Sequence, residues 1–268
     1  MFIEIREKIK KYYKNTPLSY IDLIPRYFIN ELMALPIFDF WSTAEKSPGR
    51  LNYLAIGASD VVATGDYPFG YASTIADVLQ TSGSKRVVKK YQSSLFGSYA
   101  RQIANKLRFN MGTSSKAQFD FATVLVGYND GLWNIPPSEF EVDLEELLRL
   151  ALQRCDYVYM LDAKDIKKMP GITGLPKLVE MIYSDRPIAE YADDYNEIIY
   201  KVINRINDPR IKVVKIRDNW IHTGEPELTA DGLHPNVAGY NKIARIILKK
   251  LEENEDLMGR MGIDKIVI

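Results

Sequence analysis

Short apolar runs rich in β-branched and aromatic residues alternate along this chain with stretches that repeat apolar residues at helical spacing. The runs predict five strands, at residues 51–56, 86–91, 121–126, 157–161 and 211–216. The other stretches predict helices at residues 71–80, 99–109, 142–153, 188–206 and 237–251. Such an alternation is typical of βαβ units, so the sequence predicts an α/β fold with a mostly parallel five-stranded sheet covered by helices.

The two ends of the chain do not follow this alternation. Residues 4–13 and 21–35 have helical spacing and a Pro-containing connection follows them, so we expect residues 1–50 to form a helical extension packed on one α/β domain of residues 51–268. The last residues, EDLMGRMGIDKIVI, fit either a packed tail or an oligomer contact. With 268 residues, 46% of them hydrophobic, the chain can bury a sizeable core.

The charges of the chain cancel, with 35 Lys plus Arg against 35 Asp plus Glu. A neutral chain has no overall field that attracts nucleic acid or anionic lipid, although a local basic patch stays compatible with this balance. We therefore expect a small-molecule, lipid or carbohydrate substrate and no nucleic-acid partner. The sequence leaves the oligomeric state open.

Cysteine and histidine are scarce. Cys155 is the one cysteine, which excludes an internal disulfide, and the only histidines are His222 and His234, with no zinc-ligand spacing. We expect no metal and no cofactor, and we interpret Cys155 as a buried packing residue because it opens a predicted strand.

The N-terminal residues, MFIEIREKIKKYYKN, alternate charged and apolar side chains. They lack the apolar core of about 7 to 15 residues that a secretory signal has, and no run of about 18 apolar residues predicts a membrane span. The expectation for this sequence is a cytoplasmic protein without an integral membrane segment.

Three polar blocks stand beside predicted strands and helices. GASD (57–60) follows the first predicted strand, GYND (127–130) follows the third, and DGLHPN (231–236) opens the last predicted helix. The carboxyl ends of parallel strands meet at one edge of the sheet, where such folds bind ligands. We therefore expect Ser59 and Asn129 to face the same edge.

DGLHPN places a carboxylate and an imidazole three residues apart. Asp231 can orient His234 within one helical turn, and Pro235 suits the first position of the helix that follows. His234 then has the properties of a general base for the hydroxyl of Ser59. His222, four residues after Asp218, is the competing base, and we interpret it as a loop or packing residue because no helical pattern encloses it.

Two further residues can stabilise an oxyanion. The side-chain amide of Asn129 donates hydrogen bonds without changing charge, and Gly97, at the head of a helix-like stretch, can offer a backbone N–H. A nucleophilic hydroxyl needs a base, the base an orienting carboxylate, and the oxyanion its donors. The combination predicts a serine hydrolase that cleaves an ester or thioester through an acyl-enzyme.

Each block alone has an ordinary explanation. Ser59 fits a helix cap or a loop, and Asp231 fits a cap with an incidental surface His234. Asn129 and Gly97 both fit turns. The functional interpretation depends on the four blocks occurring together.

Taken in order, these blocks resemble the GDSL or SGNH hydrolase family, which has a Ser, a Gly, an Asn and a His in four separate blocks. The match runs through Ser59, Gly97, Asn129 and His234, with Asp231 in the family's DxxH position, and spans residues 51 to about 250. The resemblance implies a three-layer α/β/α, flavodoxin-like domain that hydrolyses esters or thioesters. It also implies that the oxyanion is held by the Ser59 N–H, the Gly97 N–H and the Asn129 side chain.

The sequence departs from the family pattern at Ala58, where the GDS block has Asp. This departure keeps open a non-catalytic binding module with a decayed site, although the nucleophile, base and carboxylate are all retained. An acyltransferase with the same triad is the other alternative. An α/β-hydrolase elbow is disfavoured because GASDV lacks the second Gly of GxSxG, and nucleotide-binding Gly-rich loops are missing from the sequence.

Overall fold

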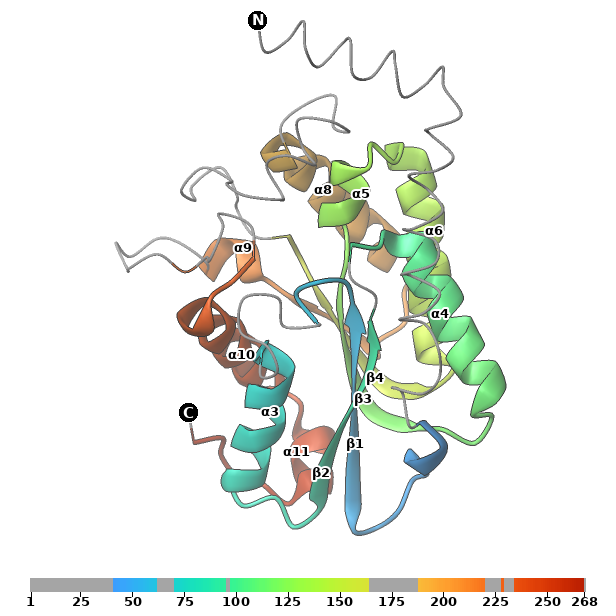
Figure 1. The fold of residues 1–268 in the computed structure, drawn as a ribbon. Helices are drawn as coiled ribbons and strands as arrows, with labels where there is room; N and C mark the ends of the chain where they lie inside the picture. Colours follow the sequence, from blue (N-terminus) through green and yellow to red (C-terminus); the bar gives the residue numbers. More distant parts are fainter. Residues whose placement is uncertain are drawn as a thin grey trace, which may run out of the picture.

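The structure is a computed structural model that describes residues 41–61, 70–94, 97–163, 188–219, 228 and 234–267. In these residues five strands form one sheet with helices on both faces (Figure 1). The strands are β1 (Arg50–Gly57), β2 (Val87–Ser94), β3 (Phe119–Leu125), β4 (Cys155–Leu161) and β5 (Ile211–Val214). The helices are the 3-10 helix η2 (Trp41–Thr43) and the α-helices α3 (Gly70–Thr81), α4 (Ala100–Thr113), α5 (Tyr128–Leu132), α6 (Pro137–Leu152), α8 (Ile188–Ile206), α9 (Ile216–Asn219), α10 (Val237–Glu252) and α11 (Glu255–Met261).

All strand pairs in the sheet are parallel, and the order is β2-β1-β3-β4-β5. The chain passes from β1 outward to β2, returns to β3 on the other side of β1, and continues to β4 and β5. The strand order therefore reverses between β1 and β3. In open α/β sheets, ligands bind beyond the carboxyl ends of the strands at this switch point.

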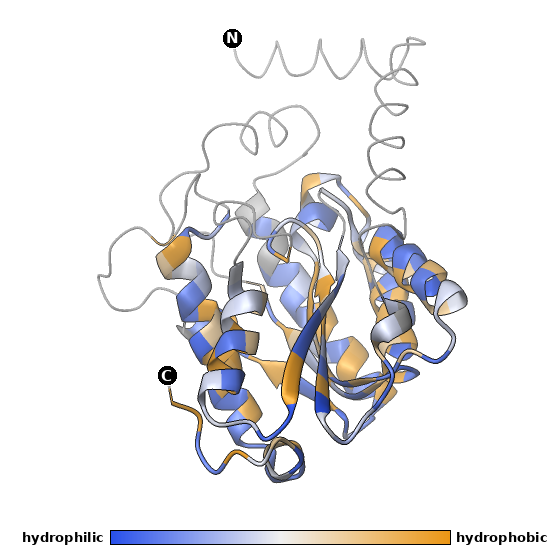
Figure 2. Ribbon diagram, turned by 60° about the horizontal axis from the view of Figure 1, so that its bottom comes forward, coloured by the Kyte–Doolittle hydropathy of each residue, from blue (hydrophilic) through white to orange (hydrophobic). Residues whose placement is uncertain are grey.

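Helices cover the two faces of the sheet in separate groups. α4, α6 and α8 pack on one face, and α3, α10 and α11 pack on the other (Figure 1). β1 supplies both layers because its side chains alternate, with Leu54 and Ile56 facing the first group and Tyr53 and Ala55 facing the second. Figure 2 shows the resulting pattern, with apolar residues turned toward the sheet and polar residues outward on the helices. The three-layer α/β/α prediction is confirmed.

Burial explains which strands the sequence shows clearly. Every residue of β3 is buried and five of its seven residues are apolar, whereas β2 lies at the edge and keeps Val87 and Lys89 exposed. The predicted strands 51–56 and 121–126 match β1 and β3 closely, and the five predicted helices match α3, α4, α6, α8 and α10. α6 begins five residues earlier than predicted because Pro137 stands in its first turn, where a missing N–H is tolerated.

The ends of the chain contribute to the core where the structure describes them. Trp41 is buried and its ring meets Phe119 of β3 edge-on, at 4.9 Å between centroids. Residues 1–40 of the predicted extension lie outside the described residues, so the proposed division at residue 50 stays a prediction. At the other end, α11 and the residues after it bury Leu257, Met261 and Ile266 against α10 and the sheet. The C-terminal segment is thus a packed tail.

Gly57 connects β1 to the block that contains Ser59. Its φ is +154°, and a Cβ at this position would overlap the carbonyl oxygen of Leu125 on β3 and lie 2.8 Å from the Val61 side chain. Only glycine adopts this backbone conformation readily, and here the close approach of β3 also requires it.

We predict that Gly57→Ala lowers the free energy of unfolding by about 2 kcal/mol or more, because it adds both backbone strain and a clash with β3. Urea unfolding followed by circular dichroism measures the change. Gly49→Ala is the matched control, since a Cβ there meets nothing within 4 Å. It should alter stability by less than about 0.5 kcal/mol. Equal effects of the two substitutions would contradict the packing argument.

Candidate active site

Ser59 lies in a tight turn directly after the central strand β1. The backbone N–H of Val61 donates to the carbonyl of Ala58 at 3.0 Å, which closes the turn around Ser59. The serine is 8% exposed, and it sits at the edge of the sheet where β1 and β3 end. The turn therefore presents the hydroxyl at the switch point of the sheet.

His234 meets this hydroxyl from the start of α10. Its Nε2 lies 3.0 Å from Ser59 Oγ, although 175 residues separate the two in sequence. The imidazole is 7% exposed, so water competes little with the contact. For Nε2 to accept the hydroxyl proton, the proton of the neutral ring must be on Nδ1.

The beginning of α10 fixes the position of His234. Asn236 caps the helix, because its side chain accepts a hydrogen bond from the Gly239 N–H at 3.0 Å. The Asn236 N–H in turn donates to the carbonyl of Leu228 at 3.0 Å. That carbonyl lies so close to Gly239 that a side chain there would overlap it. These contacts anchor the backbone two residues after the imidazole.

A second group of residues lies opposite, in the loop before α4 and the short helix α5. Asn129 donates from Nδ2 to the carbonyl of Ser98 at 2.9 Å, and Trp133 donates from its indole to the carbonyl of Gly97 at 2.8 Å. Gly97 has φ +69°, a conformation that favours glycine. The two bonds hold the loop carbonyls toward α5. One N–H of the Asn129 amide is used in this contact, which leaves the second available to another acceptor.

A small cavity joins these groups. Its volume is about 20 Å³, room for about one water molecule. Ser59, His234 and Asn129 all line it, as does Ser98, whereas Gly97 is not among the described residues that do so. The remaining lining residues are Ala58, Asp60, Leu125, Val126, Gly127 and Tyr128.

The sequence-predicted residues thus fall into three groups. Ser59, Asn129 and His234 come together around one cavity, and Gly97 lies one residue away from it. Asp231 and the competing base His222 lie outside the described residues. Cys155 is buried at the start of β4, where burial raises the pKa of its thiol, so the thiol stays protonated.

Asp130 is a buried carboxyl beside the site that the sequence did not single out. Its side chain is fully buried, and Oδ1 accepts a hydrogen bond from the Ala100 N–H at the start of α4, at 3.0 Å. Oδ2 has no hydrogen-bond partner. Burial, with a smaller contribution from the nearby Asp143, raises the pKa of Asp130 to about 7 against the opposing effect of the hydrogen bond from Ala100.

Asp130, Ser98 and Trp133 were missed for a common reason. Each takes part in a contact between the loop before α4 and α5, two segments that are distant in sequence. Only Asp130 belongs to a block, GYND, that the sequence pattern singled out. Trp133 donates from its indole to the Gly97 carbonyl, 36 residues away in sequence. The three residues together tie the loop before α4 to α5.

The described residues contain no cluster of three or more His, Cys, Asp or Glu side chains that would hold a metal ion. None of the helices in the described part of the chain is long and apolar enough to cross a membrane.

Comparison with known proteins identifies the family of the chain. The sequence matches the model of the GDSL-like lipase/acylhydrolase family over residues 54–242, well over half of its length. The chain therefore belongs to this family, as the order of its motif blocks predicts. A search of curated proteins finds no match.

Solved structures share the fold at low sequence identity. An α/β hydrolase enzyme from the metagenome of Lake Arreo, Spain, is 17% identical, with a TM-score of 0.58 over 84% of this chain and 99% of that one. An acetylxylan esterase from Geobacillus stearothermophilus is 16% identical, with a TM-score of 0.57 over 76% and 96%. TesA is 18% identical, with a TM-score of 0.55 over 77% and 99%. At such identities the likeness concerns the fold.

The raised pKa of Asp130 predicts a pH-dependent stability. A carboxyl whose folded pKa is about 7, above its ordinary value of 3.8, stabilises the fold fully below pH 3.8, and this contribution is lost as the pH rises through 7. Asn at position 130 cannot ionise. From pH 5 to pH 8 the wild type should therefore lose about 2 kcal/mol relative to Asp130→Asn, measured by urea unfolding.

Asp264→Asn is the control for this experiment, because it removes one carboxylate from an exposed position. Its stability difference from the wild type should stay constant over the same pH range. A pH-independent difference for Asp130→Asn as well would show that Asp130 does not titrate near neutral pH.

Proposed function

We propose that the chain is a serine ester hydrolase in which Ser59 is the nucleophile, His234 the general base and Asp231 the carboxylate that orients His234. The main support is the 3.0 Å contact between His234 Nε2 and Ser59 Oγ at the switch point of a GDSL-family fold. A serine hydroxyl is a weak nucleophile until a base within hydrogen-bond reach takes its proton. This contact has the required length.

Acylation follows from that geometry. His234 takes the Ser59 proton as Oγ attacks the ester carbonyl, and the carbonyl oxygen becomes an oxyanion. The Ser59 N–H, the Gly97 N–H and the Asn129 side chain are its proposed donors. When the tetrahedral intermediate collapses, His234 returns the proton to the departing alcohol and the acyl group stays on Ser59.

Deacylation repeats the same steps with water as the nucleophile. His234 takes a proton from the water, the hydroxide attacks the acyl carbonyl, and the bond to Ser59 breaks as Oγ regains its proton. Asp231 stands three residues before His234 and accepts the Nδ1 proton in this proposal, which fixes the tautomer and stabilises the imidazolium. The products are a free acid and an alcohol, and no cofactor takes part.

The small cavity favours a short acyl group. Its volume of about 20 Å³ beside Ser59 and His234 matches a methyl-sized substituent better than a long hydrocarbon chain. Tyr128 forms one wall. A structural neighbour is an acetylxylan esterase, and we extend its acyl class, an acetyl ester, to this chain as part of the proposal.

The triad predicts a sharp loss of activity from two substitutions. Ser59→Ala should lower kcat on p-nitrophenyl acetate by about 10³-fold or more and abolish labelling by a fluorophosphonate probe, because both need the nucleophile. Asp231→Asn should lower kcat by a similar factor while labelling becomes slow, because His234 loses its orienting carboxylate.

Matched controls are Ser115→Ala and Asp264→Asn, which make the same changes at exposed positions. Both should keep the wild-type rate. A wild-type chain that neither takes the label nor hydrolyses any ester would favour a binding module instead. Formation of a new ester in place of free acid when an acceptor alcohol is added would identify an acyltransferase.

The cavity predicts a preference for acetate over longer esters. We expect kcat/KM for p-nitrophenyl acetate to exceed that for p-nitrophenyl octanoate by about tenfold or more, because each extra methylene must displace the cavity wall. Tyr128→Ala should lower the ratio of kcat/KM for acetate to kcat/KM for octanoate, and Tyr128→Phe, which keeps the ring, should leave this ratio unchanged. A wild-type preference for octanoate would refute the short-acyl proposal without affecting the triad.

A further inference from the structure

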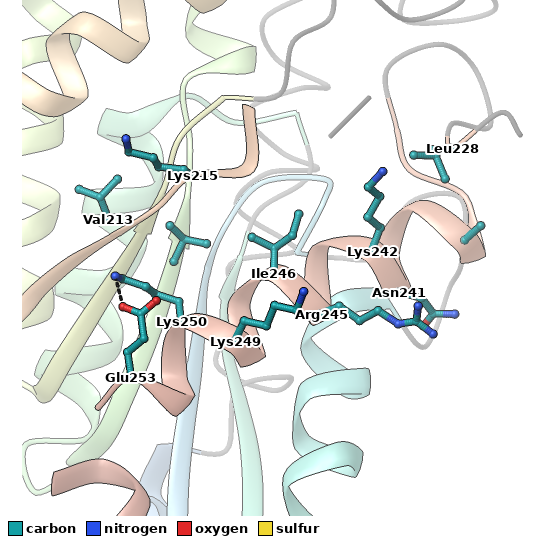
Figure 3. Close-up of a pocket in the computed structure, with 12 residues that line it drawn as sticks. Val213, Lys215, Leu228, Asn241, Lys242, Arg245, Ile246, Lys249, Lys250 and Glu253 are labelled. Atoms are coloured by element: carbon teal, nitrogen blue, oxygen red, sulfur yellow. Dashed lines mark hydrogen bonds and ion pairs between the residues drawn. The ribbon is translucent and has the colours of Figure 1, made fainter. Parts of the chain in front are cut away.

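A much larger groove lies away from Ser59, between α10 and the edge strand β5 (Figure 3). Its volume is about 760 Å³, within the range of about 300 to 1,000 Å³ that is usual for small-molecule sites. The lining residues are Val213, Val214, Lys215, Leu228, Ala238, Asn241, Lys242, Arg245, Ile246, Lys249, Lys250 and Glu253.

The charges of this groove are unbalanced. Five of the lining side chains are cationic and one is anionic, in a chain whose net charge is zero. The one carboxylate, Glu253, forms an ion pair with Lys250 (Figure 3), and Lys215 pairs with Asp218, which is not a lining residue. Positive potential is therefore concentrated in a concave surface, which attracts anions more strongly than a flat surface with the same charges.

Three of the cations follow one side of α10. Lys242, Arg245 and Lys249 are spaced three and four residues apart, so they lie above one another on the helix surface. Like charges at this spacing destabilise a helix by about 0.2 to 0.5 kcal/mol per pair. Arg245 and Lys249 are exposed and form no ion pair within the described residues. An anion bound between them would remove the repulsion.

Apart from Asn241, the rest of the lining is aliphatic. Ile246 of α10 is the central apolar side chain, with Leu228 further along the groove (Figure 3). Ala238, in the first turn of α10, continues this surface, and the buried Val214 of β5 packs beneath it on the same face of the sheet. The described lining contains no aromatic side chain, so it offers no platform on which a nucleotide base would stack. An aliphatic surface beside cations matches a hydrocarbon chain with an anionic headgroup.

We propose that this groove binds a single-chain amphiphile with a phosphate headgroup. The hydrocarbon chain lies against Ile246, Leu228 and Ala238, and the headgroup contacts Lys242, Arg245 and Lys249. A phosphate fits this set better than a carboxylate, because its double charge and three oxygens can accept a bidentate bond from Arg245 and further bonds from two lysines. The site is separate from ester hydrolysis and does not depend on the assignment of Ser59.

Isothermal titration calorimetry of the full chain with dodecyl phosphate, kept below micelle-forming concentrations, tests the proposal. The wild type should bind one molecule per chain, and added salt should weaken binding. Arg245→Glu/Lys249→Glu should weaken binding by about tenfold or more, because two charge-assisted contacts become repulsive. Lys89→Glu/Lys116→Glu makes the same change in net charge at exposed positions elsewhere and should bind like the wild type.

Ligands that carry only the hydrocarbon chain or only the phosphate test the two halves of the site separately. Dodecanol and inorganic phosphate should each bind at least about tenfold more weakly than dodecyl phosphate, because each lacks one half of the contact. Ile246→Gln should weaken dodecyl phosphate but leave the affinity for pyrophosphate unchanged. The proposal would be overturned if Arg245→Glu/Lys249→Glu and Lys89→Glu/Lys116→Glu lost affinity equally or if the wild type did not bind dodecyl phosphate. Tighter binding of adenosine diphosphate than of dodecyl phosphate would overturn it as well. An unchanged urea unfolding midpoint for Arg245→Glu/Lys249→Glu would show that its fold is intact.

Discussion

The parallel pairing of β1 with β3 is the constraint on which the site depends. Gly57, at the end of β1, stands opposite Leu125, at the end of β3, so the two motif blocks that follow these strands begin at the same level. The strand order reverses between β1 and β3, because the chain continues from β1 to β2 on one side and from β3 to β4 on the other. Because only glycine permits so close an approach at position 57, the backbone geometry that presents Ser59 is set by the sheet itself.

The two halves of the site differ in how they are held. Ser59 and His234 meet through a direct contact, and backbone and cap hydrogen bonds anchor His234 at the start of α10. The opposite half depends on side chains of α5 that bind the loop before α4, at Gly97, Ser98 and Ala100. One of these side chains is the buried carboxyl of Asp130, whose ionisation is costly. We therefore expect the stability of this loop to depend on pH.

The local sequence pattern was sufficient to predict the sheet and to single out Ser59 and His234, which the structure brings into contact. Fully buried strands such as β3 are predominantly apolar, and Ser59 and His234 belong to short blocks with recognisable residue types. Three helices that the pattern did not predict, α5, α9 and α11, have seven residues or fewer, too short for a helical period to stand out. Contacts such as Trp133 with Gly97 join residues 36 apart, and no local spacing reports them.

A zero net charge described the whole chain correctly but concealed how its charges are distributed. On the outer side of α6 and α8, Glu141 and Glu145 each pair with Arg205, so cations and anions neutralise one another there. Along α10, Arg245 and Lys249 lack such partners among the described residues, and the groove beside them is aliphatic. Composition cannot distinguish these two arrangements because both contribute to the same sum. The local imbalance becomes visible only when α10 is placed against β5, and the proposal of a ligand site away from Ser59 rests on this placement.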